Sequence, residues 1–157
     1  MLTTPLTPVK PNLTRYVDAQ MGIFDSALAE LKRGKKTGHW MWFIFPQIKG
    51  LGSSATSEYF GIHGREEAED YLSDPILGKR LIECANTLVS IDGVTAEDIF
   101  GYPDVLKLRS SMTLFESVSC ENNVFSQVLE KYYQGQRDER TLELLDRTVF
   151  NRYLAGG

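Results

Sequence analysis

The chain has 157 residues, of which 42% are hydrophobic and 24% are charged, a composition that excludes collagen-like, low-complexity and wholly disordered proteins. This length predicts one domain with one hydrophobic core. The formal net charge of -4 offers no broad basic face for duplex nucleic acid.

The N-terminal part divides into an arm and a helix. Residues 1–11 contain Pro5, Pro8 and Pro11, and proline removes backbone donors and disfavours helix in the residue before it. We therefore expect a flexible arm over residues 1–11 and a single helical domain over residues 12–157. After Asn12, a stripe at spacings of three and four predicts one long amphipathic helix that stops at Gly34. The stripe consists of Tyr16, Gln20, Ile23, Ala27 and Leu31.

Residues 35–52 have no helical period, and apolar side chains occur at both odd and even positions. They are either a buried strand or an irregular core segment, because periodicity does not distinguish the two.

Capping residues mark the helices that follow. The first four predicted helices are a short one after Ser53 or Ser54 that ends at Tyr59, one over 64–72, one that starts at Asp74-Pro75 and ends near Asp92-Gly93, and one from Thr95 to Phe100. The next is capped by Asp104, with Val105, Leu108, Met112 and Phe115 inward. Two more follow, one capped by Asn122 or Asn123 that closes at Gly135, and one capped by Asp138 with Leu142, Leu145 and Val149 inward. With at most one short strand, the fold class is all-α, as a compact multi-helical domain with an irregular aromatic-rich segment near residues 38–52.

Cysteine content and hydropathy indicate the compartment. The two cysteines are too few for a disulfide scaffold or a Cys-rich zinc site, which favours reduced thiols in the cytoplasm. Cys84 lies on the apolar stripe of its helix, where burial raises the thiol pKa and makes it inert. The opening residues lack a signal peptide core, and the longest apolar run, Trp40 to Phe45, is too short to cross a bilayer. We expect no membrane contact.

Familiar catalytic and metal signatures are missing from the sequence: it has no H-E-x-x-H, no C-x-x-C and no G-x-S-x-G. We therefore expect no metal and no cofactor. Asp18 and His39 remain candidates for a general acid or base, and Asp104 is a second carboxylate whose simpler role is a helix cap.

The segment from Lys35 to Thr56 combines two tryptophans with cations and a Gly50-x-Gly52 turn. Flat apolar faces beside cations and free backbone N–H groups suit a stacked ring with an attached phosphate. The alternative is that the aromatic residues are simply core and the cations a solvated helix end. The candidate ligand-binding residues here are Trp40, Trp42, Gln47, Lys49 and Ser53.

The second candidate segment runs from Lys107 to Phe115 and places serine and threonine in mid-helix, where their hydroxyls compete for backbone groups. Lys107 and Ser111 are four apart, as are Arg109 and Thr113, so each pair shares a face. These four residues predict an anion-binding face with Lys107 and Ser111 inward. The alternative is close helix crossing at small residues. We also expect residues 40–47 to be largely buried and to contact this helix.

Several motifs together resemble a known family. They are Tyr16-Val17-Asp18-Ala19-Gln20, His39-Trp40-Met41-Trp42-Phe43-Ile44-Phe45-Pro46-Gln47 with Gly50-Leu51-Gly52, Asp74-Pro75-Ile76-Leu77-Gly78-x-Arg80-Leu81, and Lys107-Leu108-Arg109-Ser110-Ser111-Met112-Thr113-Leu114-Phe115. They resemble the uncharacterised domain of unknown function 1810, sometimes called calpastatin-like, over nearly the whole chain after the arm. The resemblance implies a compact all-helical domain and no established activity.

A fainter similarity is to the family that cleaves N-glycosidic bonds of ADP-ribose and riboflavin-pathway intermediates, carried by Tyr16-x-x-Ala19-Gln20 and the order of the late helices. That family has a Glu-His pair before the tyrosine, whereas this chain has Thr14 and Arg15, so its catalytic acid cannot be carried over. The expected function is a small enzyme acting on a nucleotide-like or phosphorylated metabolite, including N-glycosidic bond hydrolysis of the ADP-ribose type. The alternative is a non-catalytic module that binds a small anionic ligand or a protein.

Overall fold

The computed structural model describes the backbone of residues 11–156 and the side chains of residues 12–147. Over this range it is helical, with one isolated parallel bridge between Ile48 and Ile62, which confirms the all-α prediction. The elements are η1 (Pro11–Leu13), α1 (Thr14–Gln20), α2 (Phe24–Lys32), α3 (Met41–Ile44), α4 (Ala55–Tyr59), α5 (Arg65–Ser73), α6 (Leu77–Ser90), α7 (Ala96–Phe100), α8 (Asp104–Ser117), α9 (Val124–Tyr133) and α10 (Glu139–Gly156). The predicted arm falls largely on residues outside the described range, so the division into arm and domain stays a prediction.

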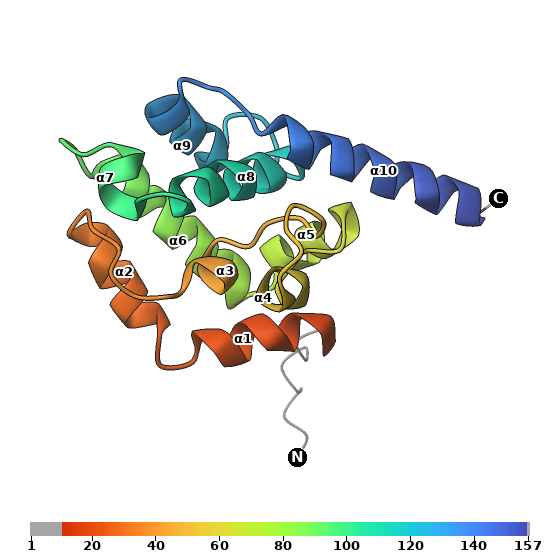
Figure 1. The fold of residues 1–157 in the computed structure, drawn as a ribbon, viewed down its shortest axis with the longest axis horizontal. Helices are drawn as coiled ribbons and strands as arrows, with labels where there is room; N and C mark the ends of the chain where they lie inside the picture. The colour runs from red at the N-terminus through yellow and green to blue at the C-terminus, as the bar shows by residue number, and fades with distance from the viewer. Residues whose placement is uncertain (1–10, 157) are drawn as a thin grey trace, which may run out of the picture.

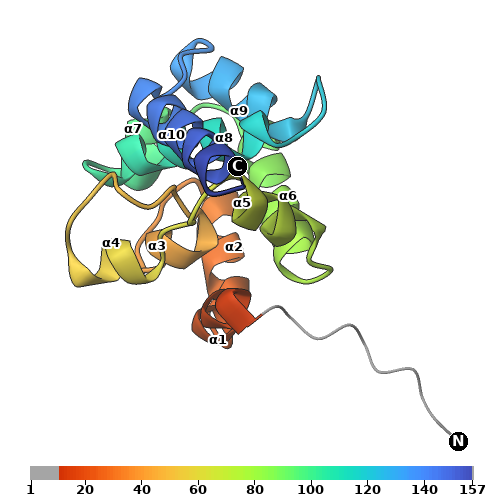
Figure 2. The same ribbon diagram turned by 90° about the vertical axis from the view of Figure 1, so that its right-hand side faces the viewer.

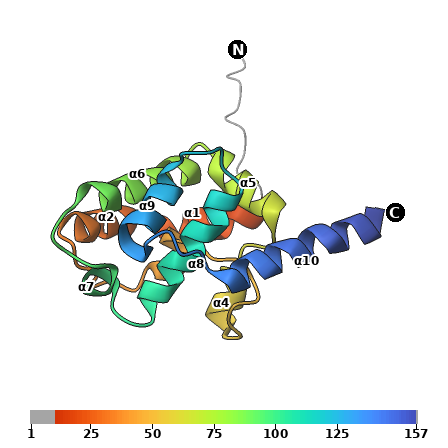
Figure 3. The same cartoon turned by 90° about the horizontal axis from the view of Figure 1, so that it is seen from above.

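Helix α8 crosses the middle of the molecule and packs on α5, α7, α9 and α10 (Figure 1). A chain of rings joins three of these helices, because Phe115 of α8 lies 5.3 Å from Tyr71 of α5 and 5.9 Å from Phe125 of α9 between ring centroids. Helix α4 stands at the edge of the fold beside α3 (Figure 2). Helix α10 starts against α8 and then runs out from the other helices (Figure 3).

The predicted long N-terminal helix is wrong, because the chain forms two helices there, α1 and α2. Gly22 lies between them with φ of 73°, a left-handed conformation that favours glycine. Ile23, expected on the buried stripe, is 38% exposed. The apolar spacing continues across the turn in sequence because Tyr16 and Gln20 are buried in α1, while Ala27 and Leu31 are buried in α2. The predicted stop at Gly34 is confirmed, with φ of 75° after α2.

Most predicted helix starts are confirmed by hydrogen bonds. The Asp74 carboxylate accepts from the backbone N–H groups of Ile76 and Leu77, just before α6. Thr95 and Asp98 form a reciprocal capping box. Ser54, Asn123 and Asp138 accept from backbone N–H groups at the starts of α4, α9 and α10.

Two expectations about helix positions are wrong. Asp104 makes no capping hydrogen bond; its carboxylate instead forms ion pairs with Lys36 and Lys107. Leu142, expected inward, is 36% exposed, because the buried face at the start of α10 carries Thr141 and Leu145 instead. The side chain of Val149 lies outside the described residues.

Residues 35–48 are the irregular core segment of the two alternatives, with only the four-residue helix α3. A buried carboxylate organises the segment: Glu30 Oε1 accepts from the backbone N–H groups of Thr37 (2.6 Å) and Gly38 (2.8 Å) and from Trp40 Nε1 (3.0 Å). Burial by itself raises the pKa of Glu30, but these donors outweigh it and lower the pKa from 4.5 to about 2. Cys84 is buried in α6, and burial raises the pKa of its thiol to about 12, as expected for an inert cysteine.

Folding stability should therefore fall in acid because of Glu30. A carboxyl whose folded pKa is depressed stabilises the fold above its unfolded pKa of 4.5 and loses this contribution as pH falls toward about 2. We expect a loss of about 2 kcal/mol over that window, allowing for solvent screening. Denaturant unfolding measured between these pH values checks it. Glu30→Gln should flatten this dependence and the exposed Glu69→Gln should not; an unchanged slope in Glu30→Gln would contradict the assignment.

Candidate functional site

A pocket of about 290 Å³ lies between residues 42–61 and the start of α8. Its lining is mostly apolar, with Ile48, Leu51, Phe60, Pro103 and Leu106. The polar residues of the lining are Trp42, Gln47, Ser57, Lys107 and Ser110. Apolar walls with a few convergent polar groups are typical of small-molecule sites.

The isolated β-bridge builds one wall of this pocket. The Ile62 N–H donates to the Gln47 carbonyl and the Lys49 N–H donates to the Ile62 carbonyl, each at 2.8 Å. Gly61 is required by this close approach, since a Cβ there would lie 2.8 Å from Lys49 Cα. The bridge therefore fixes the backbone of Gln47 next to the residues just before Ile62, the 59–61 loop.

Helix α1 holds the same loop from the other side. Arg15 donates to the carbonyls of Tyr59 (Nε, 2.7 Å) and Gly61 (Nη2, 2.9 Å). The Tyr16 hydroxyl donates to the Phe60 carbonyl at 2.6 Å, and burial raises the pKa of that hydroxyl. Successive carbonyls of the pocket wall are thus bound to α1.

An ion pair buried beneath the loop anchors Arg15. Its guanidinium lies 2.9 Å from Glu67 Oε1, and the two side chains are 10% and 4% exposed. Glu67 also accepts from the His63 N–H at 3.0 Å and from the Asn12 side chain. The position of the wall depends on this network.

The electrostatics of the pocket come from a shared carboxylate. Asp104 lies 2.8 Å from Lys36 Nζ and 3.0 Å from Lys107 Nζ, so one negative charge faces two positive ones. Burial raises the pKa of Asp104, but the hydrogen bonds from both lysines outweigh it and keep the pKa below its usual range. The Lys107 ammonium also lies 4.1 Å from the centroid of the Trp42 ring. A net positive charge therefore sits at the pocket, over an aromatic face.

The structure brings the two predicted segments together. Trp42 and Gln47 of the first segment and Lys107 of the second line the same pocket, and the expected contact between the segments is confirmed. Residues 40–47 are largely buried, although Trp42, Phe43 and Gln47 are only half-buried.

Other predicted site residues lie elsewhere. Trp40 is in the core, 1% exposed, with its indole N–H on Glu30. Lys49 and Ser53 are exposed and are not in the lining. Ser111, expected to face inward with Lys107, is fully buried away from the pocket, and its hydroxyl has no hydrogen-bond partner among the described residues.

The neighbouring Ser110 takes the place expected for Ser111. It lines the pocket, and its hydroxyl donates to the Leu106 carbonyl at 3.2 Å. The pocket therefore uses the face of α8 that carries Leu106, Lys107 and Ser110. Ser57 was also missed, although the Ser54-x-x-Ser57 spacing at the start of α4 could have indicated it.

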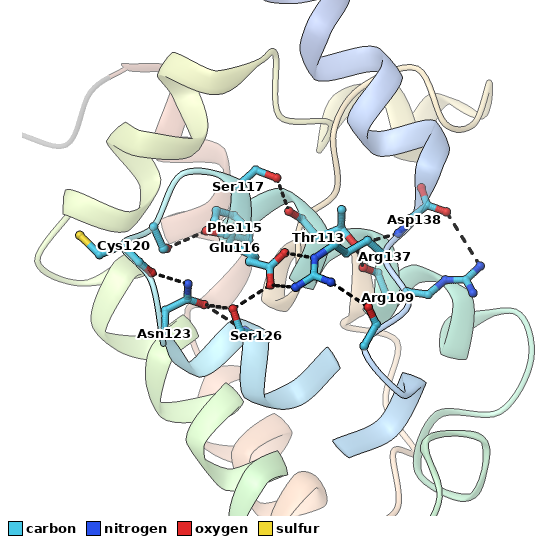
Figure 4. Close-up of polar contacts among 12 residues, drawn as sticks. Arg109, Thr113, Phe115, Glu116, Ser117, Cys120, Asn123, Ser126, Arg137 and Asp138 are labelled. Atoms are coloured by element: carbon cyan, nitrogen blue, oxygen red, sulfur yellow. Dashed lines mark hydrogen bonds and ion pairs between the residues drawn. The ribbon is translucent and has the colours of Figure 1, made fainter. Parts of the chain in front are cut away.

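Arg109 and Thr113 belong to a separate polar cluster between α8, α9 and α10 (Figure 4). Thr113 Oγ1 accepts from the Asp138 N–H at 2.9 Å, and Arg109 Nη2 lies 4.0 Å from Asp138 Oδ1. In the same cluster Arg137 binds both carboxylate oxygens of Glu116, at 2.5 and 2.6 Å. Burial raises the pKa of Glu116, but the bonds from Arg137 and Ser126 outweigh it and lower the pKa. The cluster joins the three helices.

The acid and base candidates lie outside the pocket. Asp18 and His39 are exposed, and neither is in its lining. Among the side chains of residues 12–147, no group of three or more His, Cys, Asp or Glu is arranged to hold a metal ion. None of the described helices is both long and apolar enough to cross a membrane.

Comparison with known proteins identifies the family. The model of the family described as "Protein of unknown function (DUF1810)" matches residues 10–145. The chain belongs to this family. The match confirms the resemblance found in the sequence and covers every residue that lines the pocket.

A solved relative has the same fold. The chain is similar to the conserved hypothetical protein Rv1873 from Mycobacterium tuberculosis, known from a crystal structure, with 48% identity and a TM-score of 0.84. The match covers 86% of this chain and 96% of that chain. No curated protein matches the sequence.

Proposed function

We propose that the pocket binds a small anion that carries a flat ring, such as a nucleotide-like or phosphorylated metabolite. The observation that carries the proposal is the Lys107 ammonium, which lies over the Trp42 ring and shares its ion-pair partner, Asp104, with Lys36. Because Lys36 is 9% exposed and buries its charge against Asp104, the charge of Lys107 is only partly balanced. An anionic ligand would balance it.

The ring of the ligand would lie against the flat and apolar side chains of the lining, including Trp42 and Phe60. The pocket volume of about 290 Å³ is at the lower end of the range for small-molecule sites. It suits one ring with an attached phosphate better than a whole dinucleotide.

The groups that line the pocket are suited to binding a ligand. They are an ammonium, two hydroxyls, an amide, an indole N–H and apolar faces, which bind by charge, hydrogen bonds and stacking. Hydrolysis of an N-glycosidic bond, the other function expected from the sequence, calls for a carboxylate at the reacting atom, and the described lining offers none. We further propose a cytoplasmic location, since Cys84 and Cys120 are both free thiols.

Calorimetric titration with phenyl phosphate, AMP and UMP tests the proposal. We expect the wild type to bind at least one of these ring-bearing anions and Lys107→Met to weaken that binding about 10- to 100-fold, because a hydrogen bond to a charged group is lost. Lys107→Glu should abolish it by charge reversal. Lys79→Met removes an exposed lysine outside the pocket and should leave the affinity unchanged.

Two adjacent serines provide a matched pair. Ser110→Ala should weaken binding by about 0.5–1.5 kcal/mol if one neutral hydrogen bond is lost, whereas Ser111→Ala should not change it, because only Ser110 lines the pocket. A wild type that binds none of the probes, or a folded Lys107→Met protein that binds as tightly as the wild type, would contradict the proposal.

A further inference from the structure

The pocket contains one side chain that can distinguish between flat anions. We propose that Gln47 makes the pocket selective for a heteroaromatic ring that has a hydrogen-bond donor and an acceptor side by side, as nucleobases and nicotinamide do. This inference rests on the proposed binding of a ring-bearing anion and names the class of ring.

Among the other polar residues of the lining, Trp42 carries a donor but no acceptor, and the remaining three have already committed their donors or charge. Lys107 is paired with Asp104. The Ser57 hydroxyl donates to the Ser54 carbonyl, and the Ser110 hydroxyl donates to the Leu106 carbonyl. Each of these groups can add to an existing contact, but none offers an uncommitted donor together with an uncommitted acceptor.

The Gln47 side chain does offer both. No hydrogen bond joins its amide to any residue within the described part of the chain, and the residue is half-buried and lines the pocket. Meanwhile the Gln47 backbone is fixed by the bridge, where its carbonyl accepts from the Ile62 N–H at 2.8 Å. The fixed backbone therefore places the flexible Gln47 side chain at the pocket, with the hydrogen-bonding capacity of its amide unused.

The free Gln47 amide can pair with a suitable ligand edge in place of water. A glutamine amide donates and accepts through adjacent atoms, so it pairs in two parallel hydrogen bonds with a ring edge that presents the complementary pair. A plain phenyl ring stacks equally well but leaves the amide unpaired. Sites built around such a pair reject the analogue that lacks it.

The test measures the binding of two types of ligand to the wild type and to Gln47→Met, a nearly isosteric substitution. Phenyl phosphate supplies a flat ring and an anion without the edge, whereas AMP, UMP and nicotinamide mononucleotide each supply an edge. We expect Gln47→Met to reduce the affinity for the best edge-bearing probe about tenfold or more and to change the affinity for phenyl phosphate by less than about twofold. Gln127→Met, which removes an exposed amide outside this pocket, should change neither.

The possible outcomes separate the two proposals. An equal loss for both ligand types in Gln47→Met, or no loss for either, overturns the role of Gln47 and leaves the binding of ring-bearing anions standing. A wild type that binds no probe overturns both. The melting temperature of ligand-free Gln47→Met should match that of the wild type, since the amide has no partner to lose, so a folding defect would also contradict the assignment.

Discussion

Arg15→Met should lower the free energy of unfolding by about 3–5 kcal/mol, the cost of leaving one member of a buried ion pair without its partner. Glu67 is 4% exposed, and in this variant its carboxylate would remain buried beneath the 59–61 loop without the guanidinium. The carbonyls of Tyr59 and Gly61 would lose their donor at the same time. Urea unfolding at neutral pH measures the change.

An exposed ion pair supplies the matched control for Arg15. Arg140 and Glu143 form an i,i+3 pair with side chains 49% and 59% exposed, so Arg140→Met should cost less than about 1 kcal/mol. The double variant Arg15→Met/Glu67→Met removes both buried charges and should recover much of the loss. Equal effects of Arg15→Met and Arg140→Met on the free energy of unfolding would contradict the burial of the Arg15–Glu67 ion pair.

Gly78→Ala should also destabilise the fold, by about 1–3 kcal/mol or more. A Cβ at Gly78 would lie 2.0 Å from the Leu72 carbonyl oxygen and 2.7 Å from its carbon, and these are backbone atoms at the end of α5 that cannot rotate away. Helix propensity alone predicts the opposite sign, because alanine is favoured over glycine inside a helix by about 0.5–1 kcal/mol.

The sign of the change therefore decides between close packing and propensity at Gly78. Thermal and urea unfolding of Gly78→Ala provide the measurement. Lys79→Ala, at the next position of α6 on an exposed residue, should change stability by no more than about 0.5 kcal/mol. A stabilised Gly78→Ala protein would show that α5 and α6 approach less closely than described.

Local signals in the sequence were sufficient for the helix starts and for part of the pocket. Asp74, Thr95 and Asn123 act through hydrogen bonds to residues two or three positions away, and such contacts can be inferred from sequence. Trp42 and Lys107 were identified from their chemistry rather than their position. The family, too, follows from motifs that stand in the sequence itself.

The direction in which a side chain points, and contacts between residues far apart in the sequence, could not be predicted from local signals. In α8, residues 110–115 are all buried, so no apolar stripe shows which hydroxyl faces the pocket. The four-residue spacing from Lys107 favours Ser111, whereas Ser110 is the serine that lines the pocket. Arg15 acts on carbonyls 44 and 46 residues away, and nothing near it in sequence indicates that role. The break at Gly22 was missed because the apolar spacing continues across it.

The break at Gly22 gives the two N-terminal helices different neighbours. Because α1 and α2 are separate, α1 packs on α3 and binds the 59–61 loop, whereas α2 packs on α6. The 59–61 wall of the pocket therefore depends on α1, which is itself held to the central helices, because the buried Gln20 side chain bonds Tyr71 of α5 and Arg80 of α6. Since α1 also carries the buried Arg15–Glu67 ion pair, lifting it from the surface to open the pocket costs far more free energy than a loop fluctuation.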